Sequence, residues 1–79
     1  MNETSPAVPR AVAVAKLPIE LAQFLKFSGL TESGGAAKQA IGEGRVLLNG
    51  VVETRKGRKL GVGDQVAFSG QTLIVQSPR

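Results

Sequence analysis

Apolar residues in the first half of the chain recur at the spacing of a helix. Leu21, Phe24 and Leu25 are separated by three and one positions, which places them on one helical face and predicts a helix over residues 19–28. Gly29 follows this stripe, and glycine is the residue type that commonly ends a helix. We therefore expect a first helix that stops at Gly29 and packs through its leucine and phenylalanine face.

A second helical pattern begins at Ser33, whose hydroxyl can accept hydrogen bonds from the first backbone N–H groups of a helix. Its buried stripe consists of small and aliphatic residues, namely Ala36, Ala37, Ala40 and Ile41. Gly34 and Gly35 are poor helix formers, at a cost of up to about 1 kcal/mol each relative to alanine. Two interpretations of these glycines remain open: they permit close packing against the first helix, or they leave the helix N-terminus open to a phosphate group.

After Gly44 the pattern changes from helical to alternating. Asn49-Gly50 separates two short alternating segments, and this dipeptide favours the type I′ turn of a β-hairpin. Ser69-Gly70 separates a second pair of segments. The four predicted strands cover residues 45–48, 51–54, 65–68 and 72–76. The chain is thus predicted to be an α+β domain in which two N-terminal helices pack on a small antiparallel sheet of about four strands.

The N-terminal segment is predicted to contribute little to the fold. Residues 1–17 are interpreted as a flexible tail ahead of a folded domain at 18–79. Within this tail, residues 11–16 alternate weakly and are a candidate for a short edge strand, although alanine is a poor strand former. Their apolar run of five residues is too short for a membrane span or a signal peptide. We therefore expect a cytoplasmic protein that does not bind membranes.

Composition excludes most catalytic chemistry. The 79 residues (8.2 kDa) contain no Cys and no His, so disulfides, thiolate zinc sites and the usual general base are absent. Neither a phosphate-binding loop nor a dinucleotide-binding motif is complete. We expect no enzymatic activity, no cofactor and no metal site. Because the chain has no Trp or Tyr, all three phenylalanines, Phe24, Phe27 and Phe68, are assigned to the hydrophobic core.

The chain is basic because of one short segment. Ten basic and six acidic residues give a net charge of +4. Arg55, Lys56, Arg58 and Lys59 lie within five consecutive positions, and the rest of the chain carries equal numbers of basic and acidic residues. Gly57 would let both basic pairs of a flexible loop face one nucleic-acid backbone. Such a concentration of charge is typical of a phosphate-binding site, and the alternative is a solvated loop that serves solubility.

Seven short motifs follow one another along most of the chain. They are Leu21-x-x-x-Leu25, Gly29-Leu30, Ser33, Ala37-Lys38-x-x-Ile41, Gly44-x-Val46, Asn49-Gly50 and Gly63-Asp64. Their order and spacing over residues 19–76 resemble the RNA-binding domain of the ribosomal small-subunit protein S-four. Small stand-alone bacterial members of this family similarly carry Glu32-Ser33-Gly34 and Glu53-Thr54-Arg55-Lys56. The resemblance implies an L-shaped domain, with two helices on a small sheet and RNA bound across the helices and adjacent loops.

The chain departs from this family at two positions. The broader family often carries arginine where Glu20 and Gly34 stand here, so the basic segment at 55–59 is the expected replacement for two phosphate ligands. The candidate RNA-binding residues are Lys26, Ser33, Gly34, Lys38, Arg45, Arg55, Lys56, Arg58 and Lys59. A solvated helix face is the alternative for Lys26 and Lys38. For Arg45 the alternative is a role at the C-terminus of the second helix.

The sequence therefore predicts a non-enzymatic, monomeric RNA-binding protein that holds structured RNA through phosphate contacts. The resemblance makes ribosomal RNA or the ribosome the expected partner. Two alternatives remain open: a protein-interaction module whose basic segment docks an acidic partner, and a protein that binds duplex DNA. Recognition by shape and phosphates is expected instead of base stacking, because the phenylalanines are assigned to the core.

Overall fold

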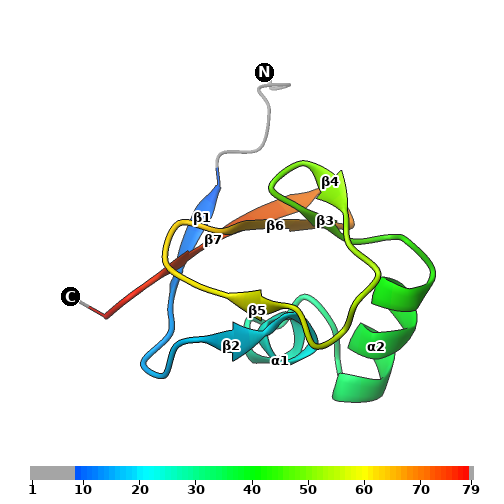
Figure 1. The fold of residues 1–79 in the computed structure, drawn as a ribbon, viewed down its shortest axis with the longest axis horizontal. Coiled ribbons are helices and arrows are strands. Elements are labelled where there is room, and N and C mark those ends of the chain that lie inside the picture. Colours follow the sequence, from blue (N-terminus) through cyan, green and yellow to red (C-terminus); the bar gives the residue numbers. More distant parts are fainter. Residues whose placement is uncertain (1–8, 79) are drawn as a thin grey trace.

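The computed structural model describes residues 9–78, which form two helices and seven short strands (Figure 1). The elements in chain order are β1 (Arg10–Ala13), β2 (Ile19–Glu20), α1 (Leu21–Phe27), α2 (Gly34–Gly42), β3 (Leu47–Leu48), β4 (Val51–Val52), β5 (Lys59–Leu60), β6 (Gln65–Phe68) and β7 (Gln71–Gln76). Five strands form one sheet in the order β1-β7-β6-β3-β4, and β2 pairs with β5 in a second, two-stranded sheet. Figure 1 shows the larger sheet along one side of the domain, with β2, β5 and α1 on the other side and α2 at one end.

The α+β class is confirmed, but the sheet is larger than predicted and is not purely antiparallel. β1 runs parallel to β7, with Arg10 opposite Leu73 and Ala13 opposite Gln76, while the other neighbouring strands are antiparallel. β1 and β2 precede the helices, so the prediction that the helices come first is wrong. The physical reason lies in the partner of β1. This alanine-rich segment has a low strand propensity of its own, and it forms a strand because it pairs with β7 at the other end of the described chain.

Ordered structure begins ahead of the predicted domain boundary at residue 18. The weak alternation over residues 11–16 corresponds to β1, which forms one edge of the larger sheet. Val14 follows β1, is buried in the core, and donates its backbone N–H to the Gln76 carbonyl at 2.8 Å. Residues 1–8 of the predicted tail lie outside the described residues.

α1 begins at Leu21, two residues later than predicted, because Ile19 and Glu20 pair with β5 as strand β2. The Glu20 backbone N–H donates to Gln23 Oε1 at 3.3 Å as part of a capping box at the start of the helix. The helix ends in the predicted region, where Gly29 adopts a left-handed φ of 83°. Both ends of α1 are thus defined by local contacts.

α2 has the N-terminal cap that the sequence predicts, because the Ala36 N–H donates to Ser33 Oγ at 3.1 Å. A Cβ atom placed on Gly34 would meet no other atom within 4 Å, and one placed on Gly35 would meet the Ser33 hydroxyl at 3.9 Å. Neither glycine is therefore required for close packing of the helices, and that interpretation is wrong. The first turn of α2 is sterically open at Gly34.

Both predicted hairpin turns are confirmed. Asn49 and Gly50 have φ values of 53° and 85°, and Ser69 and Gly70 have values of 54° and 81°. Positive φ at both central positions is the requirement of a type I′ turn. The first hairpin has strands of only two residues each, shorter than predicted, whereas β6 covers the predicted residues 65–68.

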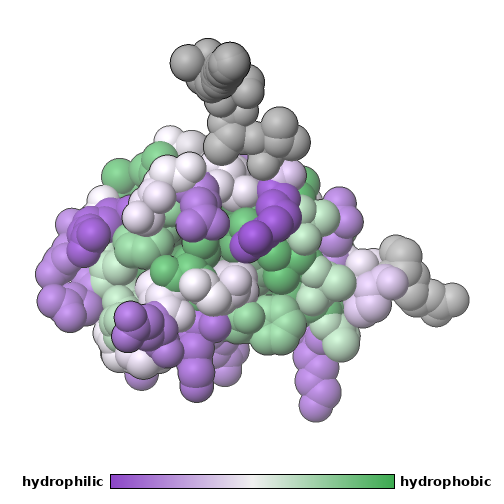
Figure 2. All heavy atoms as spheres, turned by 180° about the vertical axis from the view of Figure 1, so that it is seen from behind, coloured by the Kyte–Doolittle hydropathy of each residue, from purple (hydrophilic) through white to green (hydrophobic). Residues whose placement is uncertain are grey.

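The core lies between the larger sheet and the two helices. Its buried members are Val14, Leu21, Ala22, Phe24, Leu25, Ala37, Ala40, Ile41, Val46, Leu48, Leu60, Val66, Leu73 and Val75. Phe24 is fully buried and Phe68 packs against the core, as predicted. Phe27 is 60% exposed, so its assignment to the core is wrong. Apolar residues also reach the surface on the back of the domain, between groups of hydrophilic ones (Figure 2).

Candidate nucleic-acid interface

The basic segment at residues 55–59, hereafter the basic loop, is anchored to the N-terminus of α1. The Leu21 N–H donates to the Arg58 carbonyl at 2.8 Å, and the Ala22 N–H donates to the Lys56 carbonyl at 3.1 Å. These bonds satisfy two of the N–H groups that have no partner within a helix. The loop backbone is therefore held against α1, and the expectation that it projects freely as a flexible loop is wrong.

Glu53 holds the two arginines of the basic loop. The residue is buried (8% exposed), and its carboxylate accepts hydrogen bonds from the Arg55 backbone N–H at 3.0 Å, from Arg55 Nε and Nη2 at 3.0 and 3.2 Å, and from Arg58 Nη1 at 3.1 Å. The hydrogen bonds from the Arg55 side chain and backbone, aided by the charges of both arginines, lower the pKa of Glu53 from 4.5 to about 2 against the opposing effect of burial. The same side-chain hydrogen bond raises the pKa of Arg55. An ionised Glu53 thus fixes both guanidinium groups at neutral pH.

Arg55 and Arg58, hereafter the arginine pair, keep most of their donors for other partners. A guanidinium group carries five N–H donors. Arg55 directs Nε and Nη2 to Glu53, and Arg58 directs only Nη1 to it. The Arg55 side chain is 71% exposed and the Arg58 side chain is 42% exposed. Their remaining N–H groups can bind an external anion, and guanidinium contacts with phosphate are among the strong charge-assisted hydrogen bonds.

The two lysines of the basic loop have different surroundings. Lys59 lies in β5 opposite Glu20 of β2, and its Nζ is 3.2 Å from Glu20 Oε2. Such an exposed ion pair contributes little to stability. Lys56 is exposed and has no ion-pair partner among residues 9–78. Lys56 is therefore the cation of the basic loop whose charge no neighbouring carboxylate offsets directly.

A second group of predicted site residues lies around the end of α1 and the start of α2. Lys26 is in the last turn of α1, and Lys38 is one turn after Gly34 in α2. Both lysines are exposed, and neither has an ion-pair partner in the described part of the chain. Ser33 already uses its hydroxyl as the cap of α2. This group therefore offers two exposed cations and one open helix N-terminus.

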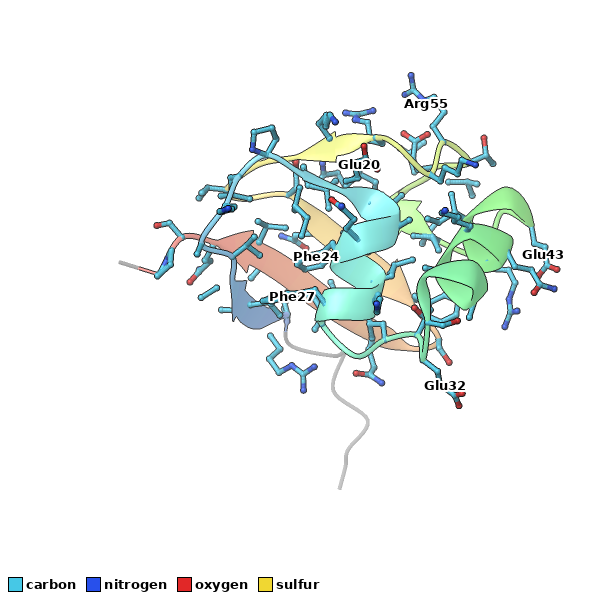
Figure 3. The ribbon with its side chains drawn as sticks, turned by 90° about the horizontal axis from the view of Figure 1, so that it is seen from below. Glu20, Phe24, Phe27, Glu32, Glu43 and Arg55 are labelled. Atoms are coloured by element: carbon cyan, nitrogen blue, oxygen red, sulfur yellow. The ribbon has the colours of Figure 1, made fainter. Side chains whose placement is uncertain are left out.

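Arg45 has partners of its own near the C-terminal end of α2. Its Nη1 is 3.4 Å from Glu43 Oε1, and its guanidinium carbon lies 5.5 Å from the centre of the Phe68 ring. Figure 3 shows Arg55 on the side of the domain where α1 begins, whereas Glu43 lies beside α2. The structure does not join Arg45 to the basic loop, and its assignment to the RNA-binding surface stays a prediction.

Reasoning from the sequence missed the role of Glu53. The signal was a single acidic residue directly ahead of the basic cluster, in a segment expected to be a strand. An acidic side chain that a strand directs inward is rarely left without partners, because an unpaired buried charge is costly. The two arginines that follow Glu53 are the partners which that argument requires.

Two further features of the described residues concern other kinds of site. No helix that the structure describes is long and apolar enough to cross a membrane. Residues 9–78 contain no cluster of three or more carboxylates that could hold a metal ion.

Comparison with known proteins identifies the family. A model of the S4 domain matches residues 12–76, which include the basic loop, both helices and most of both sheets. The chain belongs to the S4 domain family. The family of this S4 domain protein is thus the one that its sequence motifs resemble. The match also includes residues of β1, which lie ahead of those motifs.

Relatives of this S4 domain protein agree with it in sequence and fold. It is 47% identical over 57 residues to the protein named "Putative RNA-binding protein YbcJ" of Escherichia coli (strain K12), covering 72% of this chain and 81% of the relative. It is 48% identical over 52 residues to "Probable ribosome maturation protein RlbA" of Bacillus subtilis (strain 168), covering 66% and 73%. The solution structure of YbcJ from E. coli, described as revealing an alfaL motif involved in RNA-binding, matches with a TM-score of 0.63 and 36% identity over 98% of this chain and 96% of that one.

Proposed function

We propose that this S4 domain protein is a non-enzymatic, monomeric RNA-binding protein that contacts the phosphates of structured RNA, with ribosomal RNA as its target class. The names of two relatives support the proposal, since one is named for RNA binding and the other for ribosome maturation. The observation that carries the phosphate contact is the arginine pair, which the buried Glu53 carboxylate holds in place. Lys56 adds a cation beside it in the same loop.

The basic loop is suited to phosphates because its two arginines are held in place before RNA arrives. Glu53 orients the arginine pair, and the N-terminus of α1 holds the loop backbone. Binding then costs little of the side-chain and loop entropy that a mobile loop would lose. Each phosphate neutralised releases condensed counterions, which favours binding at low salt. Phosphates carry no base identity, so recognition follows the spacing of phosphates in a folded RNA.

The helix surface supplies further phosphate positions. The start of α2 is open at Gly34, and the N-terminus of a helix attracts anions through its free N–H groups and its dipole. Lys38 lies one turn further along the same face of α2. Lys26 extends this surface onto α1, which packs against α2. With the basic loop, these positions are the phosphate contacts that we propose for a folded RNA.

A pair of charge reversals tests the placement of RNA on the basic loop. Lys56→Glu and Arg10→Glu each lower the net charge from +4 to +2, but Arg10 lies on β1 at one edge of the larger sheet. Affinity for a structured ribosomal RNA fragment is measured from roughly 50 to 200 mM salt. Lys56→Glu should weaken binding to unrelated folded RNAs alike and reduce the salt slope by about 1. Arg10→Glu should have a smaller effect.

Equal affinities of these two variants would contradict the placement, because net charge alone would then explain binding. A matched DNA duplex that competes as well as the RNA would favour the duplex-DNA alternative. If the wild-type protein binds an acidic polypeptide but no RNA, the proposed function itself is wrong. Thermal unfolding of each variant confirms that folding is unchanged.

A further inference from the structure

Phe27 is a large aromatic side chain that the fold leaves in contact with water. It is 60% exposed, whereas the other phenylalanines of the chain are buried or half-buried. A buried aromatic ring contributes strongly to a core or an interface, so a ring left in water is available to a ligand. Figure 3 shows Phe27 at the end of α1 that is remote from Glu20, on the side of β1.

Phe27 borders a hollow of about 790 Å³, hereafter the Phe27 groove. Its walls come from the segment between β1 and β2, which includes Val14 and Pro18, from α1, and from Pro78 near the end of the described residues. The volume lies within the range of about 300–1,000 Å³ that is usual for small-molecule sites. The groove is therefore large enough for a planar aromatic group laid against the Phe27 ring.

The charges around the Phe27 groove select for an anion. Lys16 and Lys26 line it, and no acidic residue does. Neither lysine has an ion-pair partner among the described residues. An uncharged apolar peptide would cover the ring and leave both lysines without a counter-charge. A nucleotide supplies what the groove lacks, namely a flat aromatic body and phosphates on either side of it.

The Phe27 groove is within reach of an RNA bound at the basic loop. The Ala22 N–H contacts the Lys56 carbonyl at the start of α1, and Phe27 lies five residues further along the same helix. At a rise of about 1.5 Å per residue, the two positions are about 8 Å apart along the helix axis. One RNA that crosses the basic loop can therefore also place a nucleotide in the groove.

We propose that the Phe27 groove takes one unpaired nucleobase of the bound RNA, which stacks on the Phe27 ring while Lys16 and Lys26 contact the flanking phosphates. This inference rests on the proposed function and adds to it. Contacts at the basic loop require only phosphates, whereas the groove requires a nucleotide that is not held in a double helix, in a loop, a bulge or an end. Stacking on an aromatic ring tolerates every base, because every base has a π face.

A Phe27→Trp variant reports stacking directly, because the chain contains no other Trp and no Tyr. Its fluorescence is titrated with an RNA hairpin that has an unpaired loop, with the same hairpin carrying abasic loop nucleotides, and with a blunt duplex of the same stem. We expect strong quenching by the first RNA and little by the other two. Equal quenching by the abasic hairpin would overturn the proposal, because phosphates alone would then explain the signal.

The RNA affinity of Phe27 variants distinguishes base stacking at Phe27 from phosphate contacts elsewhere on the protein. Phe27→Ala and Phe27→Leu should bind the unpaired-loop hairpin about 5- to 150-fold more weakly than wild type and bind the duplex equally well. Phe27→Leu keeps an apolar side chain and lacks the ring, and circular dichroism verifies the fold of both. Wild-type affinity of both variants for the hairpin would refute stacking and leave the proposed function intact. If wild type binds none of these RNAs, the proposed function fails as well.

Discussion

Glu53 determines the geometry of the basic loop, because four hydrogen bonds from two arginines end on its one carboxylate. A buried carboxylate that loses these donors is left as an uncompensated charge, which is unfavourable. Removal of Arg55 or Arg58 therefore acts on folding as well as on RNA binding. A loss of affinity in either variant can be assigned to a phosphate contact only when its stability is also known.

The stability of the protein should depend on the protonation of Glu53 at acid pH. The pKa of this group is 4.5 in its ordinary state and about 2 in the fold, so the unfolded chain binds the proton more readily between these values. The contribution of Glu53 to the free energy of unfolding is thus complete above about pH 4.5 and is lost as the pH falls toward 2. Urea unfolding across this range should show a steeper loss for wild type than for Glu53→Gln. Parallel curves would show that Glu53 is not held as an ionised group.

The exposure of Phe27 follows from the same helical pattern that placed the core of α1. At about 100° per residue, the buried face centres on Leu21 and Leu25, and Phe27 lies about 140° around the helix from it. Its assignment to the core rested on the scarcity of aromatic residues, which is a statement about the whole composition. The angular position of Phe27 on the helix indicates its exposure, whereas the composition of the chain does not.

The start of α2 is an element in which stability and binding can be separated. Gly34 has no left-handed φ, and a Cβ there meets no other atom within 4 Å. Gly34→Ala should therefore raise the free energy of unfolding by up to about 1 kcal/mol. Gly34→Glu should fold as well and bind RNA more weakly, through bulk and repulsion of phosphate. Thermal unfolding and RNA affinity of both variants check this. Unchanged affinity of Gly34→Glu would remove α2 from the RNA surface.

Elements with a local signal could be predicted, and those that depend on distant partners could not. The Asn49-Gly50 turn carries its own conformational preference. The structure adds that Asn49 Nδ2 donates to Asp64 Oδ1 at 3.1 Å and that Asn49 Oδ1 accepts from the Gln65 N–H at 2.9 Å. β2 and β5 have two residues each, too few for a periodic pattern. Their pairing depends on the close approach of residues about 40 positions apart, which no local preference encodes.

The same limit applies to the candidate site. The basic residues were visible as a run along the sequence, and the structure places Arg55, Lys56 and Arg58 in the connection that leads to Lys59, the first residue of β5. The sequence did not show that Glu53 and Glu20 contact three of these cations, since Glu20 lies 39 residues before Lys59. The charge count along the sequence therefore could not show that acidic residues from outside the basic segment contact it in the fold.

At the scale of the whole molecule, removing cations that are paired with carboxylates should lower the stability of the fold more than removing unpaired cations. Replacing Arg55, Lys56, Arg58 and Lys59 by alanine lowers the net charge from +4 to zero. Replacing Lys16, Lys26, Lys38 and Lys56 by alanine gives the same net charge, but these four lysines have no ion-pair partner among residues 9–78. The two variants thus match in charge and differ in the carboxylates that they leave without a partner.

The first of these variants should unfold at a lower temperature than wild type, because Glu53 remains buried without its two arginines. The second should unfold close to the wild-type temperature, because exposed unpaired lysines contribute little to stability. Each removes four cations of the proposed RNA surface, so the log–log salt slope of RNA binding should fall by roughly 3 to 4 in both. Thermal unfolding at neutral pH and salt titrations of RNA affinity measure the two effects. Identical unfolding temperatures would show that the contacts of Glu53 with its two arginines do not stabilise the fold.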